Sequence, residues 1–211
     1  GVLNVITGGD ALGPLLTSHP DIDKITFTGS TATGKRVMES ASKDLKRITL
    51  ELGGNDAAIV LPDADVAKVA EKLFWASFYN AGQVCIAAKR IYIHEDIYDE
   101  LSAAIAAYAG AVKVGDGAEQ GTAIGPIQNK QQYNRVLELI ADAKDKGYKF
   151  LVGGDHDPSI PGYFVPVTVL DNPPEDARIV AEEQFGPVMP LMKFSTVDEV
   201  ISRANASDYG L

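Results

Sequence analysis

The residue in this chain with the clearest chemical potential is its only cysteine, Cys85, which follows Gly82 and Gln83 in the segment NAGQVC. A single thiol cannot make an intramolecular disulfide or a multi-thiolate metal site, so it is either a packing residue or a nucleophile. A carboxylate, Glu51, lies earlier in the segment TLELGGN. Glycines near both side chains predict irregular backbone, where reactive groups are often displayed. The pair favours covalent catalysis by a thiolate with a carboxylate base.

Each of these residues also has a plain structural explanation when it is considered alone. An unaccompanied cysteine is most often a buried packing residue, and a glutamate at the end of a strand is most often solvated or ion-paired. Against this, Gly82 and Gln83 are poor core formers. The short apolar strand before Glu51 predicts apolar surroundings, which disfavour a charged carboxylate and suit it to act as a base.

A second candidate site is the glycine-containing segment Gly29–Gly34, between a predicted strand and a predicted helix. Backbone N–H groups at a helix N-terminus bind anions, and Ser30 can add a hydroxyl; the alternative is an ordinary tight turn. Gly29 and Gly34 fit most of a Walker A loop, but Arg36 stands where the magnesium-binding Ser or Thr belongs. The G-x-G-x-x-G fingerprint of dinucleotide-binding folds is absent as well.

The segment Glu182–Val188 combines two acids, an aromatic residue and a Gly-Pro pair. Glu183 can hold ribose hydroxyls and Phe185 can lie against a ring, although an ordinary loop before a strand is the simpler explanation. The three histidines, by contrast, have no spacing typical of a zinc site, and we expect no metal centre.

Composition limits the possible functions. The chain has 211 residues, 45% of them hydrophobic, and a formal net charge of −10, which argues against a nucleic-acid surface. Its apolar runs are shorter than the roughly 20 residues that span a bilayer, so we expect no membrane partner. One cysteine is consistent with a reducing, cytoplasmic location. Both ends look cut, and we expect a fragment of a longer protein.

Apolar runs alternate with segments of helical period, which predicts an α/β fold with a mostly parallel sheet. The Gly53-Gly54 pair is the expected joint between a domain of residues 1–52 and a domain of residues 53–211. The predicted strands are Leu3–Thr7, Lys24–Phe27, Ile48–Leu50, Ala57–Leu61, Lys89–Ile93, Phe150–Val152, Phe164–Val169 and Val188–Phe194. The predicted helices begin near Asp10 and after Gly34, and cover Asp63–Tyr79, Ile97–Val112, Asn129–Lys146 and Thr196–Ala206.

Four segments, FTGST, LELGGN, GQVC and EQFGP, together resemble the NAD(P)-dependent aldehyde dehydrogenase superfamily in order and spacing. The resemblance covers the whole chain. It implies the C-terminal part of a Rossmann-like cofactor domain followed by an α/β catalytic domain. It also implies that Cys85 attacks an aldehyde to give a thiohemiacetal and then a thioester, which water activated by Glu51 hydrolyses to a carboxylic acid.

The cofactor contacts are likewise implied by this resemblance. Gly29, Ser30 and the turn to Gly34 match the pyrophosphate site of NAD or NADP. Leu52 matches a backbone contact to the nicotinamide amide. Glu183 and Phe185 match the contacts to the nicotinamide ribose and ring. The implied partners are a small-molecule aldehyde and further copies of the parent protein, as a homodimer or homotetramer.

The family's oxyanion asparagine motif and its adenine-ribose lysine motif do not occur in this chain. Loss of one oxyanion donor commonly lowers the rate by a factor of about a hundred to a thousand, so we expect this chain alone to be inactive or nearly so. Two alternatives remain open: a folded fragment without turnover, and a cysteine-dependent ester hydrolase without a nicotinamide cofactor. Titration with NAD and NADP, combined with an ester-hydrolysis assay, tests them: ester hydrolysis without cofactor binding would favour the hydrolase.

Overall fold

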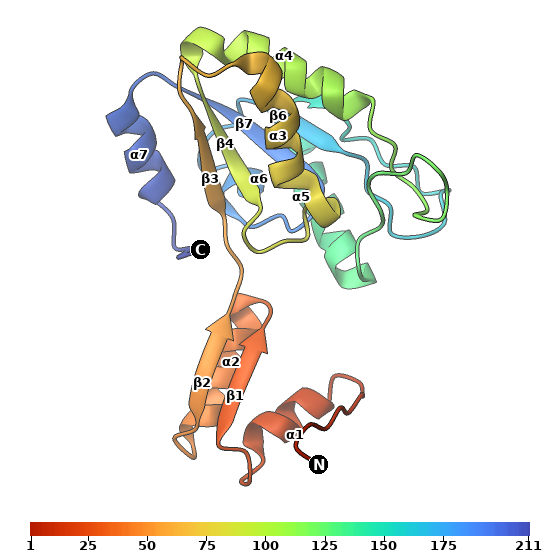
Figure 1. The fold of residues 1–211 in the computed structure, drawn as a ribbon, viewed down its shortest axis with the longest axis vertical. Coiled ribbons are helices and arrows are strands. Elements are labelled where there is room, and N and C mark those ends of the chain that lie inside the picture. Colours follow the sequence, from red (N-terminus) through yellow and green to blue (C-terminus); the bar gives the residue numbers. More distant parts are fainter. The chain divides into compact units, whose positions relative to one another are not determined.

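A computed structural model describes residues 1–211, which divide into two compact units, Gly1–Gly53 and Gly54–Leu211 (Figure 1). The first unit is built around a strand–helix–strand motif. Its two strands are parallel, with Lys24 opposite Arg47 and Thr28 opposite Glu51. Its elements are α1 (Leu12–Ser18), β1 (Lys24–Thr28), α2 (Thr31–Ser42) and β2 (Arg47–Glu51).

The second unit holds a five-stranded sheet in the order β3-β4-β7-β6-β5. Only the β5–β6 pair is antiparallel, so the predicted α/β class with a mostly parallel sheet is confirmed. Its strands are β3 (Asp56–Val60), β4 (Ala88–His94), β5 (Lys149–Val152), β6 (Thr168–Asp171) and β7 (Val188–Phe194). Its helices are α3 (Val66–Phe78), the 3₁₀ turn η1 (Tyr79–Gly82), α4 (Glu95–Gly110), α5 (Lys130–Asp145), α6 (Arg178–Ala181) and α7 (Val197–Asn205).

The sheet of the second unit has a hydrophobic cluster on each face. Successive strand residues point to opposite faces. On β4, Ile91 and Ile93 join a cluster with residues of α3 and α4, whereas Tyr92 joins a cluster with residues of α5, α6 and α7. Helices therefore cover both faces, so the strands can be apolar on both sides.

Capping residues mark the ends of α5 and the start of α7. Asn129 caps α5, and Gly147 follows that helix with a φ of +74°. Thr196 accepts a hydrogen bond from the Glu199 N–H at 3.3 Å, and the Glu199 carboxylate accepts one from the Ser195 N–H at 3.1 Å. No helix is long and apolar enough to cross a membrane.

One strand prediction is wrong and another is wrong in part. Leu3–Thr7 forms no strand, and its apolar side chains are exposed without a partner strand to pair with. The strand predicted at Phe164–Val169 begins only at Thr168. Pro166 has no N–H to donate to a ladder, and the pairing starts with the hydrogen bond from the Thr168 N–H to the Pro187 carbonyl at 2.9 Å.

Candidate active site

In the first unit, Gly29 and Ser30 form the turn between β1 and α2. The Gly29 N–H donates to the Glu51 carbonyl at 3.0 Å, which fixes the turn to the end of β2. Ser30 is the N-cap of α2, and its hydroxyl accepts from the Thr33 N–H at 3.2 Å. A twelve-residue helix thus begins directly at this turn, with the N–H groups of its first turn directed towards any anion bound there.

Gly34 is buried in α2 and has a packing role in this unit. A Cβ atom at Gly34 would lie 2.6 Å from Cδ2 of Leu52, so the absence of a side chain lets α2 approach the residue that follows β2. Gly34 therefore sets the position of Leu52 through close contact. The glycine spacing in the sequence indicated Gly34 as a candidate, but it did not distinguish a packing role from a phosphate contact.

Glu51 is the last residue of β2 and is exposed. The apolar surroundings expected from the strand before it are therefore not found in this unit. The structure gathers Gly29, Ser30, Gly34, Glu51 and Leu52 in the first unit, and Cys85, Glu183 and Phe185 in the second.

Cys85 lies in a loop with unusual backbone geometry, here named the cysteine loop (Tyr79–Ala87). Asn80, Ala81 and Gly82 are all in the left-handed region, with φ values of 53°, 57° and 71°. For the buried Ala81 this conformation costs on the order of 1–2 kcal/mol. Strain of this kind is concentrated at functional sites, where the surrounding structure must enforce it. Cys85 follows as a free, partly buried thiol in a turn.

The side chain of Gln83 stabilises the cysteine loop through hydrogen bonds. Its side-chain amide donates to the carbonyls of Asn80 at 3.1 Å and Pro126 at 3.3 Å. Its side-chain oxygen accepts from the Gln128 N–H at 2.8 Å. The glutamine before the cysteine therefore ties the loop to a segment more than 40 residues later in the chain.

Glu183 and Phe185 belong to a second loop, here named the acidic loop (Glu182–Pro187). Phe185 has a φ of +45°, a strained value for an aromatic residue. Gln132 of α5 donates to the carbonyls of Gln184 at 2.9 Å and Phe185 at 3.2 Å. The buried side chain of Gln184 donates to the Ile179 carbonyl. The main chain of the loop is thus held on both sides of the strained residue.

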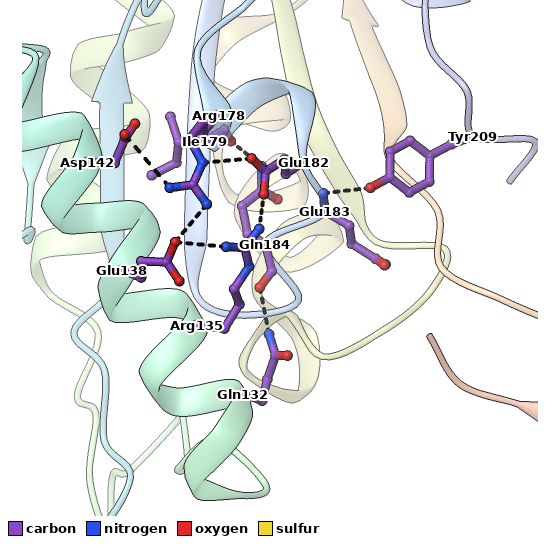
Figure 2. Close-up of polar contacts among 10 residues, drawn as sticks. All are labelled: Gln132, Arg135, Glu138, Asp142, Arg178, Ile179, Glu182, Glu183, Gln184 and Tyr209. Carbon is purple, nitrogen blue, oxygen red and sulfur yellow. Dashed lines mark hydrogen bonds and ion pairs between the residues drawn. The ribbon is translucent and has the colours of Figure 1, made fainter. Parts of the chain in front are cut away.

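A group of ion pairs fixes the start of the acidic loop to α5 (Figure 2). Arg178 binds Glu182 at 2.8 Å and Glu138 at 2.8 Å, and Arg135 binds both of these acids. Hydrogen bonds from Arg178 and Arg135 hold the pKa of Glu138 below its ordinary value. Figure 2 shows the Glu183 side chain extending away from these arginines, while its N–H donates to the Tyr209 hydroxyl at 3.0 Å.

The cysteine loop and the acidic loop are packed backbone to backbone. A Cβ atom at Gly82 would lie 2.2 Å from the Gly186 carbonyl oxygen, so only glycine fits this contact. Lys89, at the start of β4, joins the loops a second time. Its ammonium donates to the Cys85 carbonyl at 2.7 Å and pairs with Glu183 Oε1 at 3.2 Å.

Sequence reasoning missed Lys89 and Gln132. The only signal for Lys89 was a charged residue in a segment predicted to be a buried strand. The histidines lie apart in local contacts: His94 caps α4, and His156 bonds Tyr133. The chain has no group of three or more His, Cys, Asp or Glu side chains arranged to hold a metal ion.

Comparison with known proteins relates the whole chain to one family. The model of the "Aldehyde dehydrogenase family" matches residues 1–211. A probable aldehyde dehydrogenase from a Pseudomonas species is 50% identical over all of this chain and 43% of its own length. The NAD+ complex of a Bacillus cereus aldehyde dehydrogenase has a TM-score of 0.90 and 42% identity, over 94% of this chain and 40% of that one.

A third match is aldehyde dehydrogenase C of Pseudomonas syringae, a mutant in complex with NAD+ and octanal. It has a TM-score of 0.90 and 37% identity, over 95% of this chain and 42% of that one. This chain therefore spans less than half the length of the proteins it matches. Because the family model matches every residue, the chain belongs to the aldehyde dehydrogenase family.

Proposed function

We propose that the whole protein containing this chain oxidises an aldehyde to a carboxylic acid, with NAD or NADP as the hydride acceptor. The observation that carries the proposal is the packing of the cysteine loop against the acidic loop. It joins a strained, thiol-bearing turn to a carboxylate and an aromatic ring suited to a nucleotide. The solved relatives bound to NAD+ and to octanal support the same cofactor and substrate class.

The residues of the chain fit the proposed cofactor. The turn at Gly29 and Ser30 suits a pyrophosphate, because the N-terminus of α2 attracts anions there. The Leu52 main chain is proposed to contact the nicotinamide amide. Glu183 is proposed to hold the ribose and Phe185 the ring. In this proposal residues 1–52 are the C-terminal portion of the cofactor domain, and residues 53–211 are the catalytic domain. When bound, the cofactor accepts a hydride.

Cys85 is the proposed nucleophile. Its thiolate adds to the aldehyde carbon, a C–S bond forms, and the carbonyl electron pair moves to oxygen to give a thiohemiacetal. Loss of the hydride leaves a thioester on Cys85. The left-handed residues before Cys85, Gln83 and the contact with Gly186 together fix this turn, so the thiol is presented with little loss of entropy during the reaction.

Glu51 is the proposed general base of the second half-reaction. It takes a proton from water, the hydroxide adds to the thioester carbon, and cleavage of the C–S bond releases the carboxylic acid and the Cys85 thiolate. The assignment of Glu51 rests on its motif in the sequence and on its position at the end of β2.

The proposal extends to assembly and location. From the family resemblance we infer a homodimer or homotetramer. We infer a cytoplasmic location because one free thiol is compatible with a reducing compartment. Light scattering of the purified whole protein measures the assembly, and cell fractionation measures the location.

The test is the Cys85→Ser substitution in the whole protein. We expect aldehyde-dependent NADH or NADPH formation to fall by at least about a thousandfold, because a serine hydroxyl is a far weaker nucleophile than a thiolate at neutral pH. Cofactor binding, measured by isothermal titration, should remain within about twofold, since the thiol is not among the proposed cofactor contacts.

Two controls interpret this result. Residues 1–211 alone provide a low-activity reference, because the oxyanion asparagine motif is not among them. Ester hydrolysis is measured in parallel. A variant that keeps full aldehyde oxidation would refute the role of Cys85, and a whole protein that hydrolyses esters but binds neither NAD nor NADP would favour the hydrolase alternative.

A further inference from the structure

Lys89 is a buried cation whose contacts all lie beside the proposed reaction centre. Only 3% of its side chain is exposed. A lysine buried to this degree needs compensation, because an unpaired charge away from water is costly. Its ammonium is compensated by the Cys85 carbonyl at 2.7 Å and by Glu183 Oε1 at 3.2 Å.

The Glu183 carboxylate is held asymmetrically. Oε1 receives the Lys89 ammonium, and it also accepts a hydrogen bond from the Gly54 N–H at 3.2 Å. Both contacts reach Oε1, so Oε2 is the oxygen left to accept hydroxyls from a ligand. Two donors on one oxygen fix the side-chain torsion angles of an otherwise flexible glutamate.

We propose that Lys89 is a positioning residue for the reaction, acting on the cofactor through Glu183 and on the nucleophile through the Cys85 main chain. This inference rests on the proposed function. A single ammonium sets the separation between the cysteine loop and the acidic loop and directs Glu183 Oε2 towards the ribose hydroxyls. Around metal sites, loss of a residue that orients the direct ligands commonly costs about 10-fold to 100-fold in affinity or activity, and we expect an effect of similar size here.

The competing explanation is that Lys89 only anchors the start of β4. The two explanations predict different kinetics. An anchor lowers the melting temperature and the fraction of folded enzyme, and so lowers kcat while the KM for NAD stays constant. If Lys89 is a positioning residue, its substitution raises the KM for NAD of the folded enzyme. This increase in KM disappears once Glu183 has lost its charge.

The experiment compares Lys89→Met, Glu183→Gln and the double variant in the whole protein, using NAD, an aldehyde substrate and a melting curve. We expect Lys89→Met to raise the KM for NAD by at least about tenfold. Lys89→Arg, which keeps the charge, should recover part of this loss. The double variant should match Glu183→Gln in its KM for NAD within about twofold, because both changes act on the one interaction that positions Glu183.

Two comparisons allow the test to be interpreted even if Lys89→Met is unstable. The double variant leaves no uncompensated buried charge, so it provides a folded comparison if Lys89→Met is unstable. Lys193→Met is the matched control, because it removes another lysine–carboxylate pair of the same unit, to Asp99 at 3.1 Å, outside both loops. Its KM for NAD should not change.

The outcomes separate the two proposals. A wild-type protein that oxidises aldehyde, with Lys89→Met changing only the melting temperature or with the two substitutions fully additive, overturns the role of Lys89 alone. A wild-type protein that binds neither NAD nor NADP and does not oxidise aldehyde with either cofactor overturns the proposed function and this inference together.

Discussion

At the scale of single residues, Tyr92 shows how burial and a neighbouring carboxylate together raise the pKa of a hydroxyl group. Its hydroxyl donates to the Glu175 carboxylate and accepts from Arg90 at 3.3 Å. Burial and the contact with Glu175 raise the pKa of Tyr92 to about 12. A raised pKa favours the neutral phenol in the folded state, so its contribution to stability is complete below the unfolded value near 10 and is lost as the pH rises through about 12.

We therefore predict that Tyr92→Phe flattens the alkaline end of the stability profile. The free energy of unfolding of the unchanged chain should fall between pH 10 and about 12 by on the order of 1 kcal/mol more than that of the variant, after allowance for screening by solvent. Urea denaturation at several pH values measures this difference, and absorbance of tyrosinate follows the titration. Parallel profiles for the two proteins would contradict a raised pKa of Tyr92 in the folded state, because any such rise changes the pH dependence of stability.

Candidate site residues could be selected from the sequence where one side chain is unusual in its segment; their roles remain predictions. Cys85, Glu183 and Phe185 stood out because a lone thiol, an acid pair and an aromatic next to Gly-Pro are unusual in their segments. Lys89 was not predictable, because its role depends on a carboxylate 94 residues later in the chain that only the folded structure brings within 3.2 Å. The exposed setting of Glu51 depends in the same way on packing that a short apolar strand does not specify.

At the scale of elements, the contact between the cysteine loop and the acidic loop depends on Gly82. Any side chain there would both adopt a φ of +71° and place Cβ 2.2 Å from a carbonyl oxygen of Gly186. We predict that Gly82→Ala destabilises the chain by about 3 kcal/mol or more, because backbone strain and overpacking add. In the whole protein the same substitution should remove aldehyde oxidation by displacing Cys85.

Gly110→Ala is the matched control, since a Cβ atom in this last turn of α4 would meet no atom within 4 Å. It should leave the unfolding free energy unchanged or raise it by up to about 1 kcal/mol, because alanine is the better helix former. Urea denaturation of both variants measures the comparison. Equal stabilities for the two alanine variants would mean that the loops can separate without cost.

The helices were predicted more accurately than the strands for a physical reason. Apolar periodicity and capping residues are local, so α3, α5 and α7 could be predicted close to their observed bounds. A strand exists only where a partner pairs with it, and Leu3–Thr7 has none. The left-handed conformation of Asn80–Gly82 was predicted only as irregular backbone, because the close approach of Gly82 to Gly186 joins segments far apart in the sequence.

At the scale of the whole molecule, the two units differ in how much core each contains. In Gly1–Gly53 the buried apolar side chains are Val37 and Ala41. In Gly54–Leu211 two large clusters enclose the sheet. Because burial of apolar surface is the main stabilising term in folding, the first unit has a much smaller reserve of stability than the second.

We predict that trypsin cuts the 211-residue chain within the first unit before it cuts the second. Cleavage after Lys24, Lys35 or Arg47, which are exposed, should be at least about tenfold faster than cleavage after Lys113. Lys113 is a strict control, since it lies in an irregular segment yet its carbonyl accepts from the N–H groups of Ala123 and Ile124. Mass spectrometry of the time course identifies the fragments. If the peptide bond after Lys113 is cleaved first, the stability of the second unit does not extend to its longest irregular segment. Apolar burial would then not explain a difference in protease resistance between the two units.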